Sequence, residues 1–211
     1  RSKEPVIFRT TKQWFFKVED LKEKMLAANE NITWNPKAAK NAYRSWLENL
    51  RDNSITKQRY WGTAVPIWSC EDEHIVVGSV KELEELSGQK VTSMHIPEID
   101  KITITKDGKT FKRMPDVLDV WIDAGTASWN CLRYPEVKED FEEMFPADFI
   151  LEGKDQIRGW FNLLMIASML AFEKPSFKNV VMHGFINDNS GEKMSKSLGN
   201  IIEPFELIKK H

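Results

Sequence analysis

A strongly apolar segment at residues 159–172 lies between two shorter apolar runs, and this arrangement most restricts what the chain can fold into. The flanking runs, residues 147–151 and 179–182, have the length of buried strands. The middle segment has the length of a helix and is followed by Pro175, which is typical of a helix end. A strand, a helix and a strand in that order form a βαβ unit with parallel strands. The sequence therefore predicts an α/β fold.

Polar clusters follow the predicted strands. Residues 117–122 form a further strand-like run, so the three clusters are residues 119–125, 152–158 and 183–197. In an open parallel sheet, ligands bind in the crevice beyond the carboxyl ends of the strands. We therefore expect the three clusters to form one ligand site.

The last cluster, residues 183–197, combines a turn with two cations. Residues 189–191 (N-S-G) have turn chemistry, and Lys193 and Lys196 follow with serines beside them. Ammonium groups and backbone donors stabilise the charge of transferring or leaving phosphates. The pattern favours a polyphosphate site, although a solvated lysine loop is the commoner outcome for an arbitrary K-x-x-K.

The middle cluster offers groups that suit a nucleoside or an amine. Glu152 and Asp155 are carboxylates, Gln156 adds an amide, and Gly153 permits close approach of the backbone. Carboxylates accept hydrogen bonds from ribose hydroxyls and from a substrate ammonium group. The structural alternative is that Asp155 caps the following helix near the positive end of its dipole.

A charged, hairpin-like stretch at residues 66–115 is predicted to be a small mixed α/β surface insertion. It has a helical pattern at residues 80–86, and strand patterns at residues 102–105 and 110–113 flank an Asp-Gly turn. We therefore expect three parts: linker and helices at 1–65, the insertion at 66–115, and a parallel α/β part at 116–211.

The first part contains two predicted amphipathic helices, at residues 19–29 and 36–51, and residues 31–36 should end the first of them. An extended segment is expected at residues 13–18. Further along, Arg59 is followed by two aromatic residues and a glycine, which is unlike a regular helix. The structural interpretation of that stretch is a packed turn with Trp61 in the core.

Composition excludes several classes of protein. A formal net charge of −2 argues against a surface dedicated to coating nucleic acid. Two cysteines are too few for a disulfide scaffold and indicate a reducing, cytoplasmic setting. No apolar run reaches membrane-spanning length, so no membrane partner is expected. Because the sequence opens at Arg1 without Met, we interpret it as a piece of a longer polypeptide.

Four motifs together resemble the class I aminoacyl-tRNA synthetases, and most closely the isoleucyl family in its archaeal form. They are K-M-S-K-S at 193–197, D-V-W-I-D-A-G at 119–125, E-G-K-D-Q-I-R-G-W-F at 152–161 and K-Q-R-Y-W-G at 57–62. The resemblance runs from about Pro5 to the end of the sequence. It implies that residues 116–211 are the second half of the Rossmann-like class I nucleotide-binding domain, without the H-I-G-H signature of the first half.

The resemblance implies that ATP, as its Mg²⁺ complex, activates isoleucine to an adenylate, and that tRNA(Ile) then accepts the aminoacyl group. By the resemblance, Glu152 and Gly153 would contact the aminoacyl part of the adenylate, and Asp155 and Gln156 would hold its ribose and acyl region. His183 and Gly184 would lie near the adenine, and Lys193 and Lys196 would bind the phosphates. Trp121 and Trp160 would line the pocket for the amino-acid side chain. The full-length parent is expected to be a monomer, and the isolated piece to be inactive.

Departures from the family pattern are few. Ala124 replaces a serine and Lys57 replaces an arginine. Cys70 and His74 lie where many relatives carry a zinc knuckle, but even with His95 they do not complete a convincing four-ligand site, so no metal is assigned.

Three alternatives stay open. The chain could be a valyl or leucyl relative, or a non-catalytic paralogue that binds tRNA or a protein, because H-I-G-H is missing. The two tryptophans of the proposed pocket could also be ordinary core residues.

Overall fold

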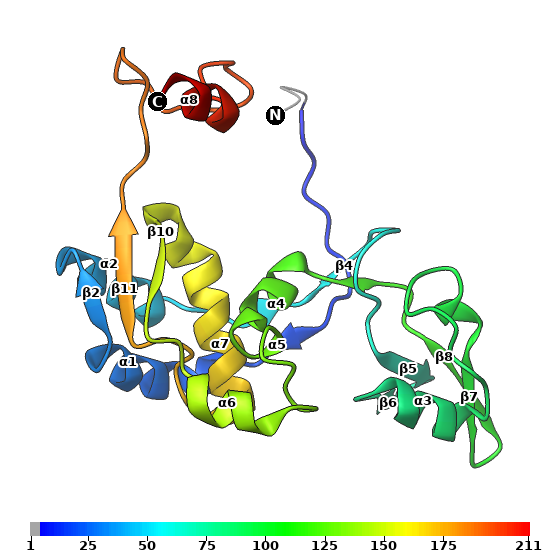
Figure 1. Cartoon of the computed structure of the whole chain (residues 1–211). Helices are drawn as coiled ribbons and strands as arrows, with labels where there is room; N and C mark the ends of the chain where they lie inside the picture. Colours follow the sequence, from blue (N-terminus) through cyan, green and yellow to red (C-terminus); the bar gives the residue numbers. More distant parts are fainter. Residues whose placement is uncertain (1–4) are drawn as a thin grey trace. The chain divides into compact units, whose positions relative to one another are not determined.

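The computed structural model describes residues 5–211, and the chain divides into two compact units (Figure 1). The first, here called the antiparallel unit, comprises Arg1–Lys22 and Leu50–Ala127. The second, the parallel unit, comprises Glu23–Asn49 and Ser128–His211. Each unit is therefore built from two separate segments of the chain. The predicted three-part division at residues 65 and 115 stays a prediction.

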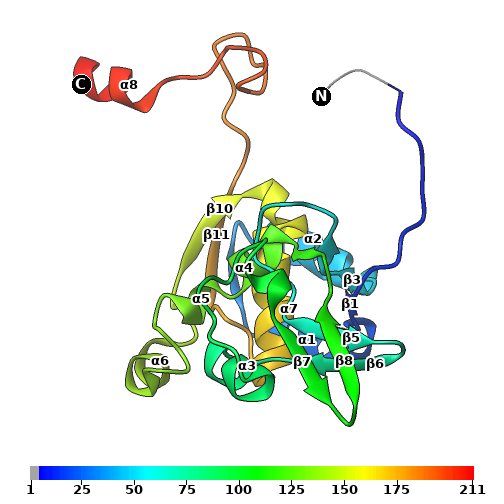
Figure 2. The ribbon, with the colours of Figure 1, turned by 90° about the vertical axis from the view of Figure 1, so that its right-hand side faces the viewer.

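The parallel unit contains a three-stranded sheet with the strand order β10-β11-β2. Strand β10 (Ile150–Gly153) runs parallel to β11 (Asn179–His183), and helix α7 (Trp160–Phe172) connects them, as Figure 2 shows. The predicted α/β class and the βαβ unit are confirmed. Strand β11 also pairs in parallel with β2 (Thr33–Asn35). This third strand was not predicted, because three residues between two helices are too few to display strand periodicity.

Helix α7 forms the centre of the parallel unit. Residues 161–169 are all buried, which explains why the segment is apolar on every side and shows no amphipathic stripe. The helix ends where Glu173 takes a left-handed conformation with φ of 55°. The predicted helix at 159–172 is therefore confirmed.

Aromatic side chains fix helix α7 against the sheet and against helix α2 (Ala38–Glu48). The ring of Phe161 meets the Trp34 ring edge-on, with centroids 5.8 Å apart. The buried Tyr43 hydroxyl donates to the carbonyl oxygen of Phe161 at 3.4 Å, and burial raises the pKa of Tyr43. Edge-to-face pairs and a satisfied hydroxyl are the arrangements that stabilise aromatic cores.

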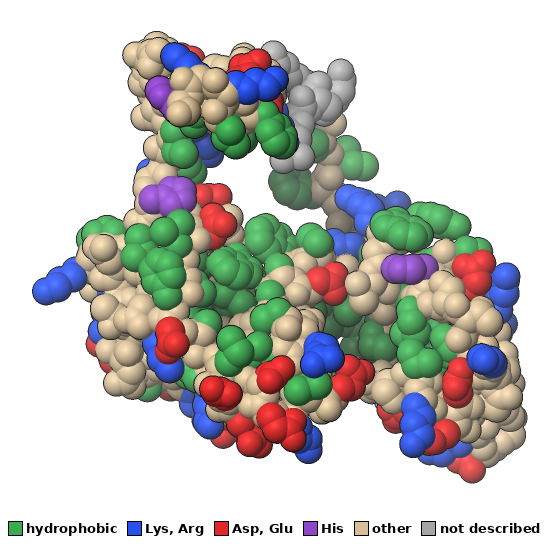
Figure 3. All heavy atoms as spheres, in the orientation of Figure 1, with side chains coloured by type: hydrophobic (Ala, Val, Ile, Leu, Met, Phe, Trp, Pro, Cys, Tyr) green, Lys and Arg blue, Asp and Glu red, His purple; other side chains and the backbone are tan. Residues whose placement is uncertain are grey.

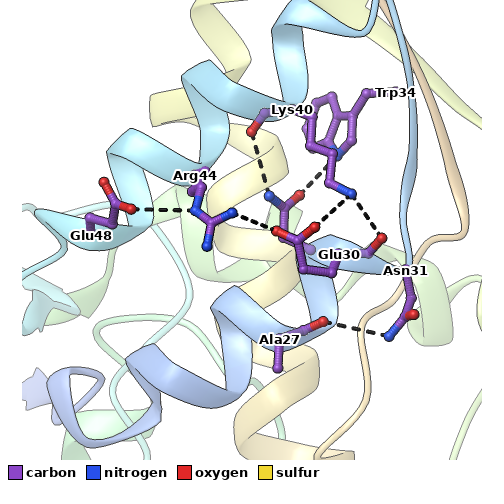
Figure 4. Close-up of polar contacts among 8 residues, drawn as sticks. Ala27, Glu30, Asn31, Trp34, Lys40, Arg44 and Glu48 are labelled. Atoms are coloured by element: carbon purple, nitrogen blue, oxygen red, sulfur yellow. Dashed lines mark hydrogen bonds and ion pairs between the residues drawn. The ribbon is translucent and has the colours of Figure 1, made fainter.

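Helices α1 (Lys22–Glu30) and α2 (Ala38–Glu48) are joined by charged groups on their exposed sides (Figure 4). The Glu30 carboxylate accepts from Arg44 at 2.9 Å and pairs with Lys40 at 3.0 Å. The hydrogen bond from Lys40, with the charges of Lys40 and Arg44, lowers the pKa of Glu30. Both helices were predicted and are confirmed.

The remaining elements of the parallel unit are short. They are the 3-10 helix η3 (Lys154–Arg158), α6 (Lys138–Met144) and α8 (Pro204–Lys210). Helix α5 (Ala127–Asn130) begins at the last residue of the antiparallel unit and continues into the parallel unit. Aromatic rings gather around Phe172, among them Trp129 at 5.1 Å and Phe141 at 4.9 Å between centroids. Acidic side chains cover the exposed side of α6 (Figure 3).

The antiparallel unit is organised around a four-stranded sheet with the order β6-β5-β8-β7. Its strands are β5 (Ile67–Cys70), β6 (Glu73–Val76), β7 (Thr103–Lys106) and β8 (Lys109–Arg113). Helix α3 (Val80–Ser87) and the 3-10 helix η2 (Ile99–Lys101) cover a core that contains Trp68, Leu83 and Phe111. The predicted helix at 80–86 and the hairpin around the Asp-Gly turn are confirmed.

Shorter strands complete this unit. Strand β1 (Phe15–Phe16) pairs with β3 (Asn53–Ser54), and β4 (Thr56–Lys57) pairs with β9 (Val117–Leu118), both antiparallel. The first two elements along the described part of the chain are β1 and the 3-10 helix η1 (Glu19–Leu21).

The strand predicted at residues 117–122 is wrong beyond Leu118. Helix α4 (Val120–Gly125) begins there, because the Asp119 side chain accepts a hydrogen bond from the Trp121 amide at 3.0 Å and so caps the helix. Strand β9 also belongs to the antiparallel unit. Residues 119–125 therefore do not follow a strand of the parallel sheet, and only the clusters at 152–158 and 183–197 follow strands of that sheet.

None of the helices within residues 5–211 has both the length and the apolar character needed to cross a lipid bilayer.

Candidate active site

Two of the predicted clusters leave neighbouring strands at the same point. Strands β10 and β11 are parallel and adjacent, and Gly153 pairs with His183 in their register. Glu152 therefore lies beside Met182, and the η3 segment starts next to the segment that follows His183. This is the edge at which parallel α/β sheets bind ligands.

Close contact of the two strand ends explains the glycine at position 153. A Cβ atom there would lie 2.8 Å from Oδ1 of Asp155 and 3.4 Å from the His183 ring. Gly184, by contrast, has no heavy atom within 4 Å of such a position. Because Gly153 has no side chain, the Asp155 carboxylate and the His183 imidazole can lie close to the Gly153 backbone.

The hydrogen bond of His183 fixes its neutral tautomer. Its Nδ1 lies 2.7 Å from the carbonyl oxygen of Gly184, which can only accept. Nδ1 therefore carries the proton, and Nε2 is left as an acceptor. An exposed ring nitrogen that accepts suits a ligand amino group.

The beginning of helix α7 is capped by Gln156 rather than by Asp155. The Gln156 side-chain oxygen accepts from the Trp160 amide at 2.8 Å, whereas η3 has no side-chain cap. Asp155 lies in the first turn of η3, where a carboxylate suits the positive end of the helix dipole, so the structural interpretation of Asp155 stays open beside the functional one. Asp155 is exposed, and its carboxylate faces Gly153.

The segment at residues 186–202, here called the lysine loop, is held by hydrogen bonds between its own residues. Asp188 accepts from the Ser190 amide at 3.0 Å and the Glu192 amide at 2.9 Å. Its other oxygen accepts from the Asn200 side chain at 2.7 Å. The hydrogen bond from Asn200, followed by those from Ser190 and Glu192, lowers the pKa of Asp188 to about 2. The predicted turn at 189–191 is present, with Gly191 at φ of 83°.

The two lysines of this loop have different surroundings. The Lys193 ammonium lies 3.6 Å from the centre of the Phe185 ring, and the Lys154 ammonium lies 4.5 Å from the same ring. A cation over an aromatic face is attracted to it, so Lys193 has a resting position on Phe185. Lys196 is exposed, and within residues 5–211 no ion pair involves it.

The two tryptophans of the expected pocket are in different units. Trp160 is half-buried at the first residue of α7, and Trp121 is 41% exposed on α4. The core interpretation does not fit Trp121, whereas it stays open for Trp160, because the Trp160 ring packs on the buried Phe161 ring with centroids 6.3 Å apart. Whether both wall one pocket stays a proposal.

Helix α4 is fixed at both ends within the antiparallel unit. The Asp119 carboxylate, which caps the helix, pairs with Lys57 at 3.0 Å. At the other end, the Thr63 hydroxyl donates to the Asp123 carboxylate at 3.0 Å. These side chains and Trp121 line a hollow of about 630 Å³. Residues of the 57–62 and 119–125 motifs therefore line one hollow within the antiparallel unit.

Trp61 is not in the core, contrary to the structural interpretation of its segment. It is 70% exposed, and its ring stacks on His95 with centroids 4.6 Å apart. His74 is also engaged elsewhere, because its Nδ1 lies 2.9 Å from the Ser69 hydroxyl. Among residues 5–211, no group of three or more His, Cys, Asp or Glu side chains is placed to hold a metal ion.

Three residues of the site were not found from the sequence: Phe185, Asp188 and Asn200. Asp188 carried a usable signal, since an aspartate two residues before a Ser-Gly pair often forms an Asx turn. Phe185 and Asn200 gave none, because their roles depend on how the loop folds back on itself.

Comparison with known proteins decides the family. The family model "tRNA synthetases class I (I, L, M and V)" matches residues 1–211. The chain belongs to the class I tRNA synthetases. The resemblance on which the sequence analysis relied is therefore confirmed, and the parallel sheet described above is part of a class I synthetase fold.

Curated class I synthetases with similar sequences are named isoleucine–tRNA ligase. That of Methanocorpusculum labreanum is 51% identical over 99% of this chain, and that of Methanothermobacter marburgensis is 48% identical over 100%. This chain spans about a fifth of those relatives, 20% and 21% of their lengths.

A solved structure of the same class is similar in fold. Mycobacterium tuberculosis methionyl-tRNA synthetase bound by methionyl-adenylate matches 99% of this chain and 33% of its own, with a TM-score of 0.61 and 26% identity.

Proposed function

We propose that the complete protein activates isoleucine with ATP, releases pyrophosphate, and transfers the isoleucyl group to tRNA(Ile). The observation that carries this proposal is the parallel register of β10 and β11. It brings residues 152–156 and residues 183–184 together at the carboxyl ends of the two strands. The lysine loop continues from the same strand, β11. Isoleucine is preferred over leucine or valine because the similar curated relatives are named isoleucine–tRNA ligase.

Activation is an in-line attack of the isoleucine carboxylate on the α-phosphate of ATP, which enters as its Mg²⁺ complex. Such a reaction depends on positioning and on stabilisation of charge, with little covalent work by side chains. Lys193 and Lys196 would stabilise the charge on the phosphates as pyrophosphate leaves. Lys196 is the stronger candidate, because Lys193 already has a partner in Phe185.

The residues at the carboxyl ends of β10 and β11 would hold the rest of the adenylate. Glu152 and Gly153 would contact its aminoacyl part, while Asp155 and Gln156 would accept from or donate to the ribose and acyl region. His183 and Gly184 would lie near the adenine. The acceptor Nε2 of His183 suits the amino group of adenine, since Gly184 already occupies Nδ1.

Trp121 and Trp160 would wall the pocket for the isoleucine side chain. An apolar pocket discriminates against one missing methylene by only about 1–3 kcal/mol. Such a pocket alone would therefore admit valine at an appreciable rate, and editing elsewhere in the complete protein would have to correct this.

We also propose that the complete protein is a cytoplasmic monomer.

The test is amino-acid-dependent exchange between ATP and labelled pyrophosphate, measured with the full-length protein and separately with isoleucine, valine and leucine. Isoleucine should give the highest kcat/KM. A higher value with valine or leucine would reject the assigned substrate. No exchange with any of the three would favour the non-catalytic alternative.

A further inference from the structure

We propose that Asp188 and Asn200 are positioning residues, which together hold the lysine loop in the form that presents Lys193 and Lys196 to a nucleotide phosphate. The inference rests on the proposed function for the role of the two lysines. It goes beyond that function by assigning the shape of the loop to a carboxylate–amide pair outside the K-M-S-K-S segment.

Asp188 organises the first half of the loop. One carboxylate oxygen accepts from the Ser190 amide at 3.0 Å, from the Ser190 hydroxyl at 2.7 Å and from the Glu192 amide at 2.9 Å. The backbone of Asp188 adds a bond from its amide to the Glu192 carbonyl at 2.8 Å. The chain is thus turned back immediately before Lys193.

Asn200 organises the second half and joins it to the first. Its side-chain oxygen accepts from the Ser195 amide at 2.9 Å, immediately before Lys196. Its side-chain nitrogen donates to the second oxygen of Asp188 at 2.7 Å and approaches the Lys193 carbonyl at 3.5 Å. One amide therefore contacts the backbone on both sides of Met194.

The loop needs such a pair because burial does not hold it. Lys193 and Lys196 are exposed, and the side chains of Asp188, Met194 and Asn200 are only half-buried. Ordering a free loop at the moment of binding costs conformational entropy, which weakens binding of the ligand that requires the order. A loop that is already ordered avoids that cost.

The donor–acceptor arrangement makes a reciprocal exchange possible. In Asp188→Asn, the amide of the new side chain faces the amide of Asn200, and in Asn200→Asp two carboxylates face each other. In the double variant Asp188→Asn/Asn200→Asp, a donor again faces an acceptor with the direction reversed. The oxygens that accept from the Ser190, Glu192 and Ser195 amides are retained.

The experiment compares these three variants in the full-length protein by isoleucine-dependent pyrophosphate exchange. Each single variant should lower kcat/KM for ATP by about tenfold or more, with little change in KM for isoleucine, and the double variant should recover most of the loss. Asp148→Asn is the matched control. It removes the same charge from an exposed carboxylate that pairs with Lys178, and it should leave exchange unchanged.

A second measurement does not depend on activity. Trypsin cleavage after Lys193 and Lys196, mapped by mass spectrometry, should be faster in each single variant and return to the original rate in the double variant. Single variants that keep both the original exchange and the original cleavage rate would overturn the inference. So would a double variant as impaired as the singles. If the unmodified protein shows no isoleucine-dependent exchange, the proposed function fails, and the cleavage rates still decide whether the pair holds the loop.

Discussion

Helix α7 and the lysine loop belong to the same unit but are stabilised by different forces. Residues 161–169 of α7 are buried, and their position follows from packing of apolar side chains. The lysine loop is largely exposed, and its shape follows from a few directed hydrogen bonds of Asp188 and Asn200. Substitutions in the helix should therefore act on stability, whereas substitutions in the loop should act on the reaction.

The largest effect is expected in the helix. Phe161→Ala removes a fully buried ring that contacts Trp34, and such truncations cost about 3–5 kcal/mol. Amide hydrogen exchange across α7 in the full-length protein should become faster. Phe205→Ala is the control, because that ring on α8 is 76% exposed. Equal exchange in the two variants would mean that burial of Phe161 does not hold the helix.

The next effect is expected in the loop and leaves stability unchanged. Lys196→Ala removes an exposed ammonium group, so the rate of isoleucine activation should fall by about 10²–10³-fold. KM for isoleucine should change little, and the melting temperature should not change. Lys210→Ala, which removes an exposed lysine from α8, serves as the control. An unaltered rate in the Lys196 variant would remove this lysine from the mechanism.

A smaller effect is expected where the rigid strands meet the site. Gly153→Ala places a methyl group 2.8 Å from Asp155 Oδ1, so the carboxylate must move. Displacement of a positioning group by about 1 Å can cost up to about 10²-fold, and we expect a loss of about 10- to 100-fold in kcat/KM for ATP. Gly184→Ala should cost less, because nothing lies within 4 Å of its added carbon. The reverse order would contradict the close-contact explanation of Gly153.

The smallest effect concerns pH. The pKa of Asp188 is lowered from 3.8 to about 2, so its hydrogen bonds contribute fully above about pH 4 and are lost as the pH falls through about 2. Titration of the Asp188 carboxyl carbon by NMR should show this low pKa. In Asn200→Ala it should move toward the ordinary value, because the largest cause is then absent. An ordinary pKa in the unmodified protein would mean that the carboxylate is not held as described.

The sequence predicted α7 well because a buried helix between two buried strands leaves an apolar signal in its own residues. It failed at α4 because Val120, Trp121 and Ile122 suit a strand as well as a helix, and the Asp119 cap decides between them. The pairing of β2 with β11 was also missed, since it depends on residues far apart in the chain.

At the candidate site, motifs identified the residues with exposed chemistry but not those that support them. Lys193 and Lys196 belong to the five-residue pattern K-M-S-K-S, which can be compared directly with the family signature. Asp188 and Asn200 lie on either side of that pattern, and their side chains meet only when the loop has folded, through the hydrogen bond between them. Trp121 and Trp160 were named together from motifs, and their joint role stays a proposal.

The pairing of β2 with β11 also has a consequence for synthesis of the protein. The hairpin of β7 and β8 joins neighbouring residues, so it can form as soon as that short stretch has left the ribosome. Strand β2 emerges much earlier, yet its partner β11 follows only after the whole antiparallel unit has been made. We therefore expect the antiparallel unit to fold first, while β2 and helices α1 and α2 stay incompletely packed until β11 completes their sheet.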